Sequence, residues 1–438
     1  MKTQKIKSLK ILLIPYNDSA YYFNMLNGLA SEFNEMRHKA IVLLNPPSSN
    51  ELKKIISEQK IDLVLSINKI LGRNEKIKIP LFCWIQDVFP STESTLTQYL
   101  GDNEYIYTFG DSHDLGFEEI PHNYLGSLIT GVSKLDTNFN NKKKWDLDIS
   151  FCGYIPSPLK IAKNPRFLEL FYDKLFFISK NLYQFLTCLS GPGYLTRNTH
   201  VLIKEIVEST YKPLRGSLDV VLLEKKIREI IRYSKKDDQA SDRSENFFSP
   251  NINYIKNLFW LIDTKIDRLI RYYVHTYPRY LDRDFLLQNI ISSFPEKKIK
   301  IYGVGWDSHP RYKKLSHPHI TNKHDLHNIY KLSKINLNNN THGFGLHSRV
   351  LECINAGGFL MTHKSKSDSG PGGILSSFEE NKHFGFYDPN DLYSSVSEWL
   401  KNDNKRLNAV KDAQKIILSE HLWRYRANQI LNDYNLIS

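Results

Sequence analysis

The stretch from Leu337 to Gly358 reads LNNNTHGFGLHSRVLECINAGG and contains a complete structural unit in a short span. An apolar strand end is followed by a polar loop rich in asparagine and glycine. The loop leads into a helix whose apolar positions Val350, Leu351 and Ile354 fall on one face. Strand, loop and helix in this order are typical of a parallel sheet that binds ligands in the loops after its strands.

The ends and the polar face of this helix indicate a binding site. Ser348 is the expected N-cap, and Gly357 stands where a helix ends in a left-handed residue. Arg349 and Glu352 are three residues apart and therefore share the face opposite the core. The loop 338–347 would offer backbone donors to a pyrophosphate at the helix N-terminus, and Glu352 would accept hydrogen bonds from sugar hydroxyls. The alternative is a solvated ion pair on a surface helix, worth about 0.3 to 0.5 kcal/mol.

The first third of the chain repeats the same alternation. Short apolar runs between Leu9 and about Val132 alternate with helical stretches long enough to cover a sheet face. The expected strands are Leu9 to Ile14, Ala40 to Leu44, Leu63 to Ser66, Leu81 to Ile85 and Tyr105 to Phe109, and the expected helices are Tyr22 to Met36 and Asn50 to Gln59. Such repeats predict a parallel, doubly wound sheet.

A second alternation starts at Ile149 and is interrupted. Its expected strands are Ile149 to Cys152, Ile299 to Tyr302, Asn336 to Leu337, Phe359 to Thr362 and His383 to Phe386, with helices at Asp325 to Leu332, Ser348 to Ala356 and Asp391 to Leu400. The interruption shows only helical patterns, at Phe167 to Leu186, His200 to Thr210, Leu222 to Ser234, Tyr254 to Tyr277 and Asp282 to Ser293. The polar segment 234–249 predicts a mobile loop, and residues 404–435 predict one long helical tail.

The sequence therefore predicts an α/β protein with two doubly wound Rossmann-like lobes, the second interrupted by a helical insertion. The expected domains are an N-terminal lobe at 1–145, a C-terminal lobe at 146–163 and 295–403, a helical insertion at 164–294 and a helical tail at 404–438. Ligands in such folds bind outside the carboxyl ends of the strands. In the N-terminal lobe this edge holds Asp87 and His113, which are candidates for a general base or for positioning a substrate; the alternatives are a turn residue and an ordinary loop histidine.

The segment 301–306 places Gly303 and Gly305 directly after a strand, where missing side chains let backbone groups approach a ligand. A tight turn that simply ends the strand is the alternative. A dinucleotide fingerprint would need a third glycine, and Ser308 stands at that position. Trp306 would either stack on a base or cover a sheet edge.

Composition narrows the class of protein. The chain has 438 residues with a net charge of +12 and is 41% hydrophobic, which is ordinary globular composition and suits an anionic partner. The cysteines are widely spaced within apolar runs and predict reduced core thiols in a cytoplasmic protein: Cys83, Cys152, Cys188 and Cys353. We expect no membrane span, no export and no nucleic-acid partner.

Two sequence patterns resemble metal-binding motifs, but we interpret neither of them as a metal site. Five histidines between His309 and His327 have spacings that fit no known zinc site. Asp146-Leu-Asp148 leads directly into a strand and is interpreted as linker. The sequence predicts no metal.

Several of these segments carry a resemblance to a known family. The segments are LSKINLNNN, HGFGLHSRVLECINAGGFLMT, PNDLYSSVSEWLKND and SEHLWRYRANQIL, together with the turns after Ile149 and Ile301. They resemble the donor-binding lobe of group 1 glycosyltransferases with the GT-B fold, closest to the branch of spore-maturation-type proteins. In that branch a phrase like Glu420-His421 with Arg426 closes the lobe.

The resemblance implies transfer of a sugar from a nucleotide sugar, the co-substrate, without a tightly bound cofactor or a required metal. The acceptor would be a glycan, a lipid-linked saccharide or a protein. It implies that Glu352 binds the donor ribose, that the loop Gly343-Phe344-Gly345 lies near the sugar and diphosphate, and that Arg349 neutralises phosphate. The residues expected to bind the donor are Gly153, Gly303, Gly305, Trp306, Asn340, His342, Gly343, Phe344, Gly345, Arg349 and Glu352.

The reaction would retain the configuration of the sugar, as in most relatives with such a glutamate. Asp87 and His113 would then only position the acceptor; an inverting reaction would need one of them as its base. Many relatives carry a second carboxylate eight residues before the glutamate, where this chain has Phe344. The alternatives are therefore a non-catalytic protein that binds nucleotide sugars or glycans and, on a similar sheet, a dinucleotide-dependent oxidoreductase.

The helical insertion is rich in aromatic and basic residues. They are Arg268, Arg271, Tyr272, Tyr273, Tyr277, Arg279 and Tyr280. Such a face would rest on the inner surface of an anionic membrane and bring the enzyme to a lipid-linked acceptor. The alternative is a buried aromatic helix pair with solvated arginines.

Overall fold

The computed structural model describes residues 8–69, 77–87, 100–115, 117, 119–120, 122–135, 145–156, 197–215, 219, 222–231 and 270–437. The chain divides into two compact units. The first comprises Met1–Tyr154, Leu214–Ser217 and Leu287–Ser438, and the second comprises Ile155–Pro213 and Leu218–Leu286. The predicted mobile loop at 234–249 and the predicted helix at 167–186 lie outside the described residues.

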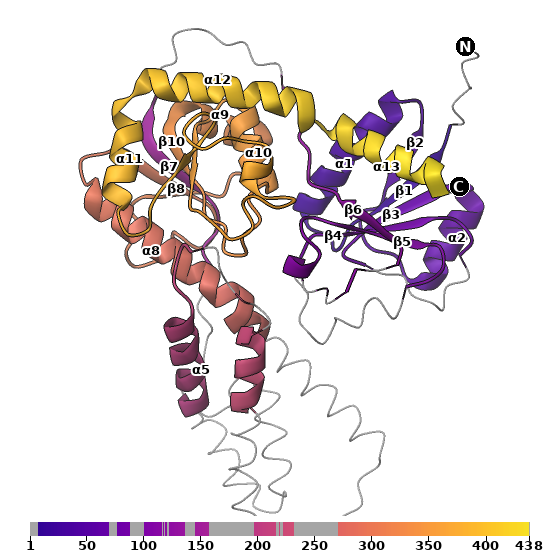
Figure 1. The fold of residues 1–438 in the computed structure, drawn as a ribbon, viewed down its shortest axis with the longest axis horizontal. Coiled ribbons are helices and arrows are strands. Elements are labelled where there is room, and N and C mark those ends of the chain that lie inside the picture. The colour runs from indigo at the N-terminus through magenta and orange to yellow at the C-terminus, as the bar shows by residue number, and fades with distance from the viewer. Residues whose placement is uncertain are drawn as a thin grey trace, which may run out of the picture. The chain divides into compact units, whose positions relative to one another are not determined.

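The first unit contains two six-stranded sheets, and every strand pair in them is parallel (Figure 1). The N-terminal sheet has the order β2-β1-β3-β4-β5-β6. Its strands are β1 (Lys10–Ile14), β2 (Lys39–Val42), β3 (Leu63–Ile67), β4 (Leu81–Ile85), β5 (Glu104–Thr108) and β6 (Tyr124–Ser127). With helices α1 (Ala20–Glu35), α2 (Ser49–Gln59) and α13 (Trp423–Ile437), they form the structure that we call the N-terminal lobe.

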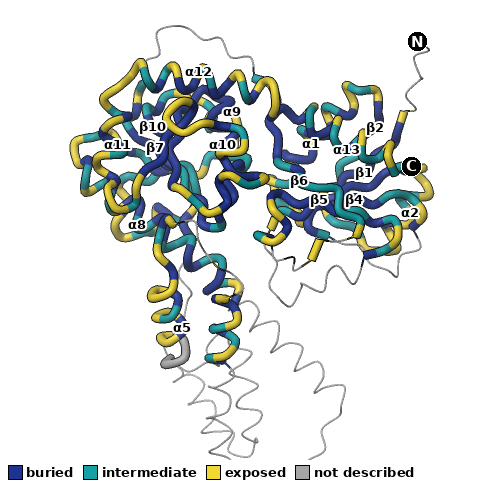
Figure 2. Tube along the Cα trace, in the orientation of Figure 1, coloured by how far each residue is buried: buried dark blue, intermediate teal, exposed yellow. Residues whose placement is uncertain are grey.

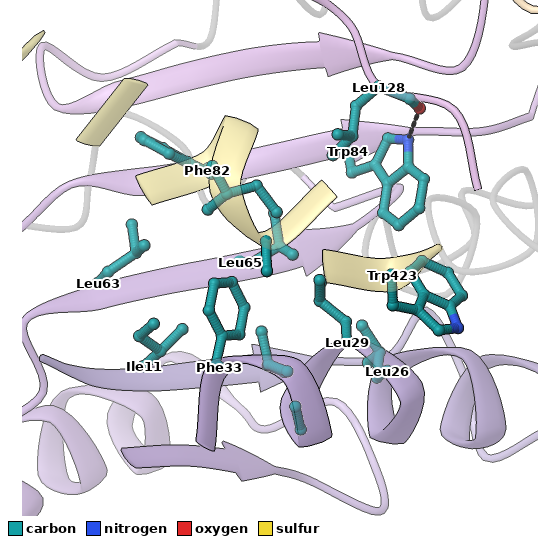
Figure 3. Packing of buried hydrophobic residues seen from close by; sticks show 14 of the residues in the cluster. Ile11, Leu26, Leu29, Phe33, Leu63, Leu65, Phe82, Trp84, Leu128 and Trp423 are labelled. Atoms are coloured by element: carbon teal, nitrogen blue, oxygen red, sulfur yellow. Dashed lines mark hydrogen bonds between the residues drawn. The ribbon is translucent and has the colours of Figure 1, made fainter. Parts of the chain in front are cut away.

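The core of the N-terminal lobe lies between the sheet and two helices from opposite ends of the sequence (Figure 3). Ile11 from β1 and Phe33 from α1 are fully buried, and Trp423 at the start of α13 packs in the same cluster. The indole N–H of Trp84 donates to the carbonyl oxygen of Leu128 at 2.7 Å, so this large buried ring leaves no polar atom unsatisfied.

The C-terminal sheet has the order β12-β11-β10-β7-β8-β9. Its strands are β7 (Leu147–Cys152), β8 (Ile299–Tyr302), β9 (Ser316–His317), β10 (Ser333–Leu337), β11 (Leu360–Thr362) and β12 (Gly385–Phe386). Helices α9 (Lys323–Leu332), α10 (Ser348–Asn355), α11 (Leu392–Lys401) and α12 (Asp403–Glu420) complete what we call the C-terminal lobe. Figure 2 shows the central strands largely buried and the outer helix faces exposed. The predicted pair of doubly wound lobes is confirmed.

Two strands and one helix break differ from the sequence predictions. β6 and β9 were not predicted, because β6 is only half-buried and β9 has two polar residues. The predicted single tail is two helices, α12 and α13, that break between Glu420 and Trp423. At the break Val132 donates its N–H to the carbonyl of His421 at 2.9 Å and accepts the N–H of Trp423 at 3.1 Å. These bonds take backbone groups that a continuous helix would use within itself.

Helix α10 begins one residue differently from the prediction and ends as predicted. His347 is its N-cap, with extended backbone angles, and Ser348 is the first helical residue. The prediction of Ser348 as the cap is therefore wrong by one position. Gly357 has φ +81°, which confirms the left-handed termination.

The described elements of the second unit are all helical. They include α5 (Arg197–Thr210), a helix over 222–231, and a π-helical turn, Tyr272–Thr276, that leads into α8 (Tyr277–Ser293). Tyr273 and Tyr277 are buried, and the rings of Tyr277 and Tyr280 stack with their centroids 6.1 Å apart. This packing resembles the buried aromatic pair that was one of the two predicted arrangements, whereas Arg268 lies outside the described residues.

Candidate active site

The strand order of the C-terminal sheet marks where a ligand would bind. From β7 the chain continues to β8 and β9 on one side, and then returns to place β10, β11 and β12 on the other. The switch point therefore lies between β7 and β10, and sheets of this kind bind their ligands at the loops that follow the two strands of the switch point. Those loops contain Gly153 and residues 338–347, which the sequence singled out.

Two glycines bring the backbone segments that follow β7 and β8 into direct contact. The N–H of Gly153 donates to the backbone carbonyl oxygen of Tyr302 at 2.8 Å, and Gly303 has φ +142°. A Cβ at position 303 would lie 2.3 Å from the carbonyl oxygen of Gly153. Only glycine fits such an approach.

Replacing Gly303 with alanine is expected to lower the free energy of unfolding by about 2 to 3 kcal/mol, because backbone strain adds to a backbone clash. Gly126→Ala is the matched control, since Gly126 has φ +101° but no atom within 4 Å of the added Cβ. The control should show the strain alone, about 1 kcal/mol. Urea unfolding of both variants measures the difference, and equal losses would contradict the proposed clash.

Trp306 lies inside the lobe. Its side chain is fully buried, its ring packs edge-on against Phe151 and Tyr312, and its indole N–H donates to Gly153 at 2.5 Å. Of its two predicted roles, covering the sheet fits this position, because stacking on a base needs an accessible ring face. Gly305, with φ +90°, forms the turn that precedes it.

Arg349 and Glu352 occupy the polar face of α10, near the switch point. Arg349 donates from Nη1 to the carbonyl oxygen of Cys152 at 3.1 Å, and a Cβ on Gly153 would lie 2.8 Å from that nitrogen. Glu352 lies 3.7 Å from the Nζ of Lys323, at the start of α9. Burial raises the pKa of Glu352, while Lys323 and Arg349 oppose that rise. Arg349 and Glu352 are thus neither fully solvated nor buried in the core. Lys323 is a further member of the candidate site, and the sequence did not predict it.

The loop before α10 is held by a chain of polar contacts. His347 shares a 3.2 Å hydrogen bond through Nε2 with the Oδ1 of Asn340, and the N–H of Asn340 donates to Nε2 of His363 at 2.9 Å. His363 is buried and was not predicted. Its Nδ1 is 3.1 Å from the carbonyl oxygen of Lys364, which can only accept, so the proton lies on Nδ1. This network fixes the loop that also contains His342 and Gly343.

Phe344 is buried among side chains of the N-terminal lobe. It is 2% exposed and belongs to a cluster of buried N-terminal-lobe residues that includes Leu115. Its ring meets that of Phe109 edge-on at 5.9 Å, and a Cβ on Gly110 would lie 2.7 Å from it. Phe344 therefore anchors one lobe to the other. Neighbouring Gly345 cannot carry a side chain, since a Cβ there would lie 2.5 Å from the backbone nitrogen of Ile374.

A second contact joins the lobes next to this anchor. Lys366 lies 3.2 Å from Asp114 on the N-terminal lobe, and the hydroxyl of Ser367 donates to the same carboxylate. Gly372, with φ +74°, approaches the carbonyl oxygen of Phe109 so closely that a Cβ would lie 2.4 Å away. The loop after β5 in the N-terminal lobe therefore packs tightly against the loops after β10 and β11 in the C-terminal lobe.

The two candidates in the N-terminal lobe follow neighbouring strands, β4 and β5, and both are exposed. Asp87 accepts hydrogen bonds at Oδ2 from the hydroxyl of Tyr22 at 3.2 Å and from Asn68 at 2.5 Å. His113 shares a 3.0 Å hydrogen bond through Nδ1 with the carbonyl oxygen of Phe117. A carbonyl can only accept, so Nδ1 carries the proton and Nε2 is the basic nitrogen. Tyr22 and Asn68 were not predicted.

Among the described residues, no group of three or more His, Cys, Asp and Glu side chains is placed to hold a metal ion. Asp148 of the D-x-D spelling lies in β7 and pairs with Lys334 at 2.8 Å. Cys83, Cys152 and Cys353 are free thiols, and Cys188 lies outside the described residues. None of the helices that the structure describes is long and apolar enough to cross a membrane.

The break between α12 and α13 has its own polar network. His421 is buried, its ring stacks on Phe378 at 5.5 Å, and its Nδ1 accepts from Arg426 at 3.0 Å. Burial and the neighbouring guanidinium lower the pKa of His421 to about 3, so the imidazole stays neutral. Arg426 also donates to the carbonyl oxygen of Thr130 at 3.3 Å. The two residues thus link the segments that run between the lobes.

Residues 283–432 match the model of a family described as glycosyl transferase-like. No curated protein matches the chain. A glycosyltransferase from Rickettsia africae is similar in structure with a TM-score of 0.49 and 10% identity, over 98% of this chain and 99% of that chain. The HepE protein of Anabaena, in complex with UDP and glucose, is similar with a TM-score of 0.44 and 10% identity, over 98% of this chain and 100% of that chain.

Proposed function

We propose, from the match of residues 283–432 to the glycosyl transferase-like family, that this chain transfers a sugar from a nucleotide-sugar donor to an acceptor hydroxyl. The observation that carries the proposal is the pair Arg349 and Glu352 on α10, with Arg349 against the end of β7 at the switch point. Arg349 would supply a cation that binds phosphate, and Glu352 would supply a carboxylate that accepts hydrogen bonds from sugar hydroxyls. Both lie within the matched range.

The donor would lie with its ribose at Glu352 and its diphosphate at Arg349 and the N-terminus of α10. During transfer the bond between the anomeric carbon and the diphosphate oxygen breaks, the acceptor oxygen bonds to that carbon, and the acceptor proton passes to the leaving diphosphate oxygen. Arg349 and the first backbone N–H groups of α10 would balance the charge that develops on the leaving diphosphate, without a metal ion. We propose a retaining reaction, in which Asp87 and His113 position the acceptor, a glycan, a lipid-linked saccharide or a protein.

Donor binding is tested by a thermal-shift screen with UDP-, GDP-, ADP-, CMP- and dTDP-sugars, because a ligand of the folded state raises its melting temperature. One nucleotide family should stabilise the wild type, and Glu352→Gln should weaken its binding by about tenfold or more, since a hydrogen bond to a charged group contributes about 1.5 to 3 kcal/mol.

Glu58→Gln is the control, because Glu58 lies on the exposed face of α2 and pairs there with Lys54 at 3.9 Å. It should bind the donor as the wild type does. A folded wild type that no nucleotide sugar stabilises would argue against the proposed function, as would Glu352→Gln binding that equals the wild type.

A non-catalytic nucleotide-sugar-binding protein is the second candidate, and Phe344 favours it. Where many relatives have a carboxylate at the transferred sugar, this chain has an aromatic ring that is buried in the other lobe. Release of nucleoside diphosphate, measured with and without a panel of acceptors, separates the two functions. Donor binding without any turnover would favour the binding protein.

A further inference from the structure

Three tyrosines form a platform on the N-terminal lobe. Tyr16 follows β1, and Tyr21 and Tyr22 lie in the first turn of α1. Tyr21 meets Tyr22 edge-on with ring centroids 5.1 Å apart, and Tyr16 meets Tyr22 in the same way at 6.0 Å. Tyr16 is 41% exposed and Tyr21 46% exposed, although aromatic side chains normally bury most of their area. The half-buried ring of Tyr22 thus supports two rings that meet solvent.

The platform is hydrogen-bonded to the carboxylate of Asp87, which a second hydrogen bond from the fold holds in place. The hydroxyl of Tyr22 donates a hydrogen bond to Asp87. Burial together with that carboxylate raises the pKa of Tyr22, so the hydroxyl keeps its proton. Asn68 also donates to Asp87, and its Oδ1 accepts the N–H of Gln86 at 2.6 Å. Asn68 has φ +50°, a left-handed conformation that asparagine adopts more readily than most residues, and its two hydrogen bonds fix its side chain. Asn68 is therefore a positioning residue for Asp87.

The platform lies next to the proposed donor site. The hydroxyl of Ser348, the first residue of α10, donates to the hydroxyl of Tyr21 at 3.5 Å. Arg349 follows Ser348 directly in the sequence. A ligand resting on Tyr21 would therefore lie beside the helix N-terminus that is proposed to hold the diphosphate.

We propose that the Tyr16, Tyr21 and Tyr22 platform with Asp87 binds the acceptor, and that the acceptor is an uncharged saccharide. This inference rests on the proposed function. A sugar ring has an apolar C–H face that packs on exposed aromatic rings, and hydroxyls at its edge that donate to a fixed carboxylate. An alkyl chain over the same face would desolvate the phenol hydroxyls and Asp87 without replacing their hydrogen bonds. An acidic sugar would place its charge against Asp87.

The test uses the full chain and a panel of neutral probes: methyl glucoside, methyl galactoside, methyl mannoside, maltotriose and triacetylchitotriose, with octanol as an alkyl probe. Saturation-transfer NMR and calorimetry measure binding to the wild type, Tyr21→Ala, Tyr21→Phe and Tyr16→Ala. At least one saccharide should bind, and each alanine variant should weaken it roughly tenfold through loss of the stacked ring. Tyr21→Phe should stay within about twofold, because it keeps the ring face.

Tyr393→Ala is the matched control, since Tyr393 is 55% exposed on α11 in the other lobe, and it should bind the saccharide as the wild type does. Wild-type binding by both Tyr21→Ala and Tyr16→Ala, binding of octanol alone, or a panel in which nothing binds would overturn the inference. The donor screen is run on the same samples. A normal donor shift without saccharide binding rejects this inference alone, whereas a missing donor shift rejects the proposed function.

Discussion

Phe344→Ala should lower the free energy of unfolding by about 3 to 5 kcal/mol, the usual range for deleting a buried phenylalanine ring. Phe344 is 2% exposed and fills a space among N-terminal-lobe side chains, although it belongs to a loop of the C-terminal lobe. Its removal therefore creates a cavity where the lobes meet. Urea unfolding measures the loss, and X-ray scattering measures whether the lobes separate.

Two further variants isolate the role of this ring. Phe344→Leu keeps most of the volume and should lose less than about 1.5 kcal/mol. Phe33→Ala removes a ring that is fully buried within the N-terminal lobe alone, so it should destabilise to a similar extent without changing the scattering profile. A Phe344→Ala protein with wild-type stability would contradict the anchoring role.

Arg349→Ala should lower kcat/KM for sugar transfer by about a hundredfold to a thousandfold, the effect of removing one preorganised donor to a developing negative charge. Its guanidinium lies against Gly153 at the switch point, where the proposal places the leaving diphosphate. Arg349→Lys should recover part of the rate, because lysine keeps the charge but loses the planar fork that binds phosphate with two hydrogen bonds. Steady-state kinetics with the donor identified in the screen measures both.

Arg424→Ala provides the comparison, since Arg424 is an exposed arginine on α13 that contacts Tyr425. It should transfer sugar at the wild-type rate. Unchanged kinetics in Arg349→Ala would remove Arg349 from the reaction, and a large fall in its melting temperature would show that the side chain is mainly structural.

The sequence predicted the strands that are long and apolar and missed those that are neither. β1, β3 and β4 are short runs of apolar residues between helical patterns, so their burial follows from composition. β9 is only Ser316–His317 and is formed by pairing with β8, which no local pattern encodes. The break between α12 and α13 has the same origin, since it depends on Val132 in a distant segment.

The sequence predicted the residues of the candidate site that share one helix, but it could not predict those that only tertiary packing brings together. Spacing placed Arg349 and Glu352 on one face of α10, and the structure has them there. Lys323 and Tyr22 join their partners only through tertiary structure, and neither position has a local signal. Burial decides the role of Phe344, because a loop pattern does not reveal which core an aromatic side chain enters.

The return of α13 to the N-terminal lobe has a consequence for the order in which the chain folds during synthesis. Trp423, Ala427 and Ile430 fill the same cluster as Leu26 and Phe33 of α1. A ribosome makes these two helices several hundred residues apart, which at roughly 5 to 20 residues per second separates them by tens of seconds. During that interval the apolar face of α1 lacks its partner and is open to aggregation or to a chaperone. The lobe that is translated first is therefore the last to complete its core.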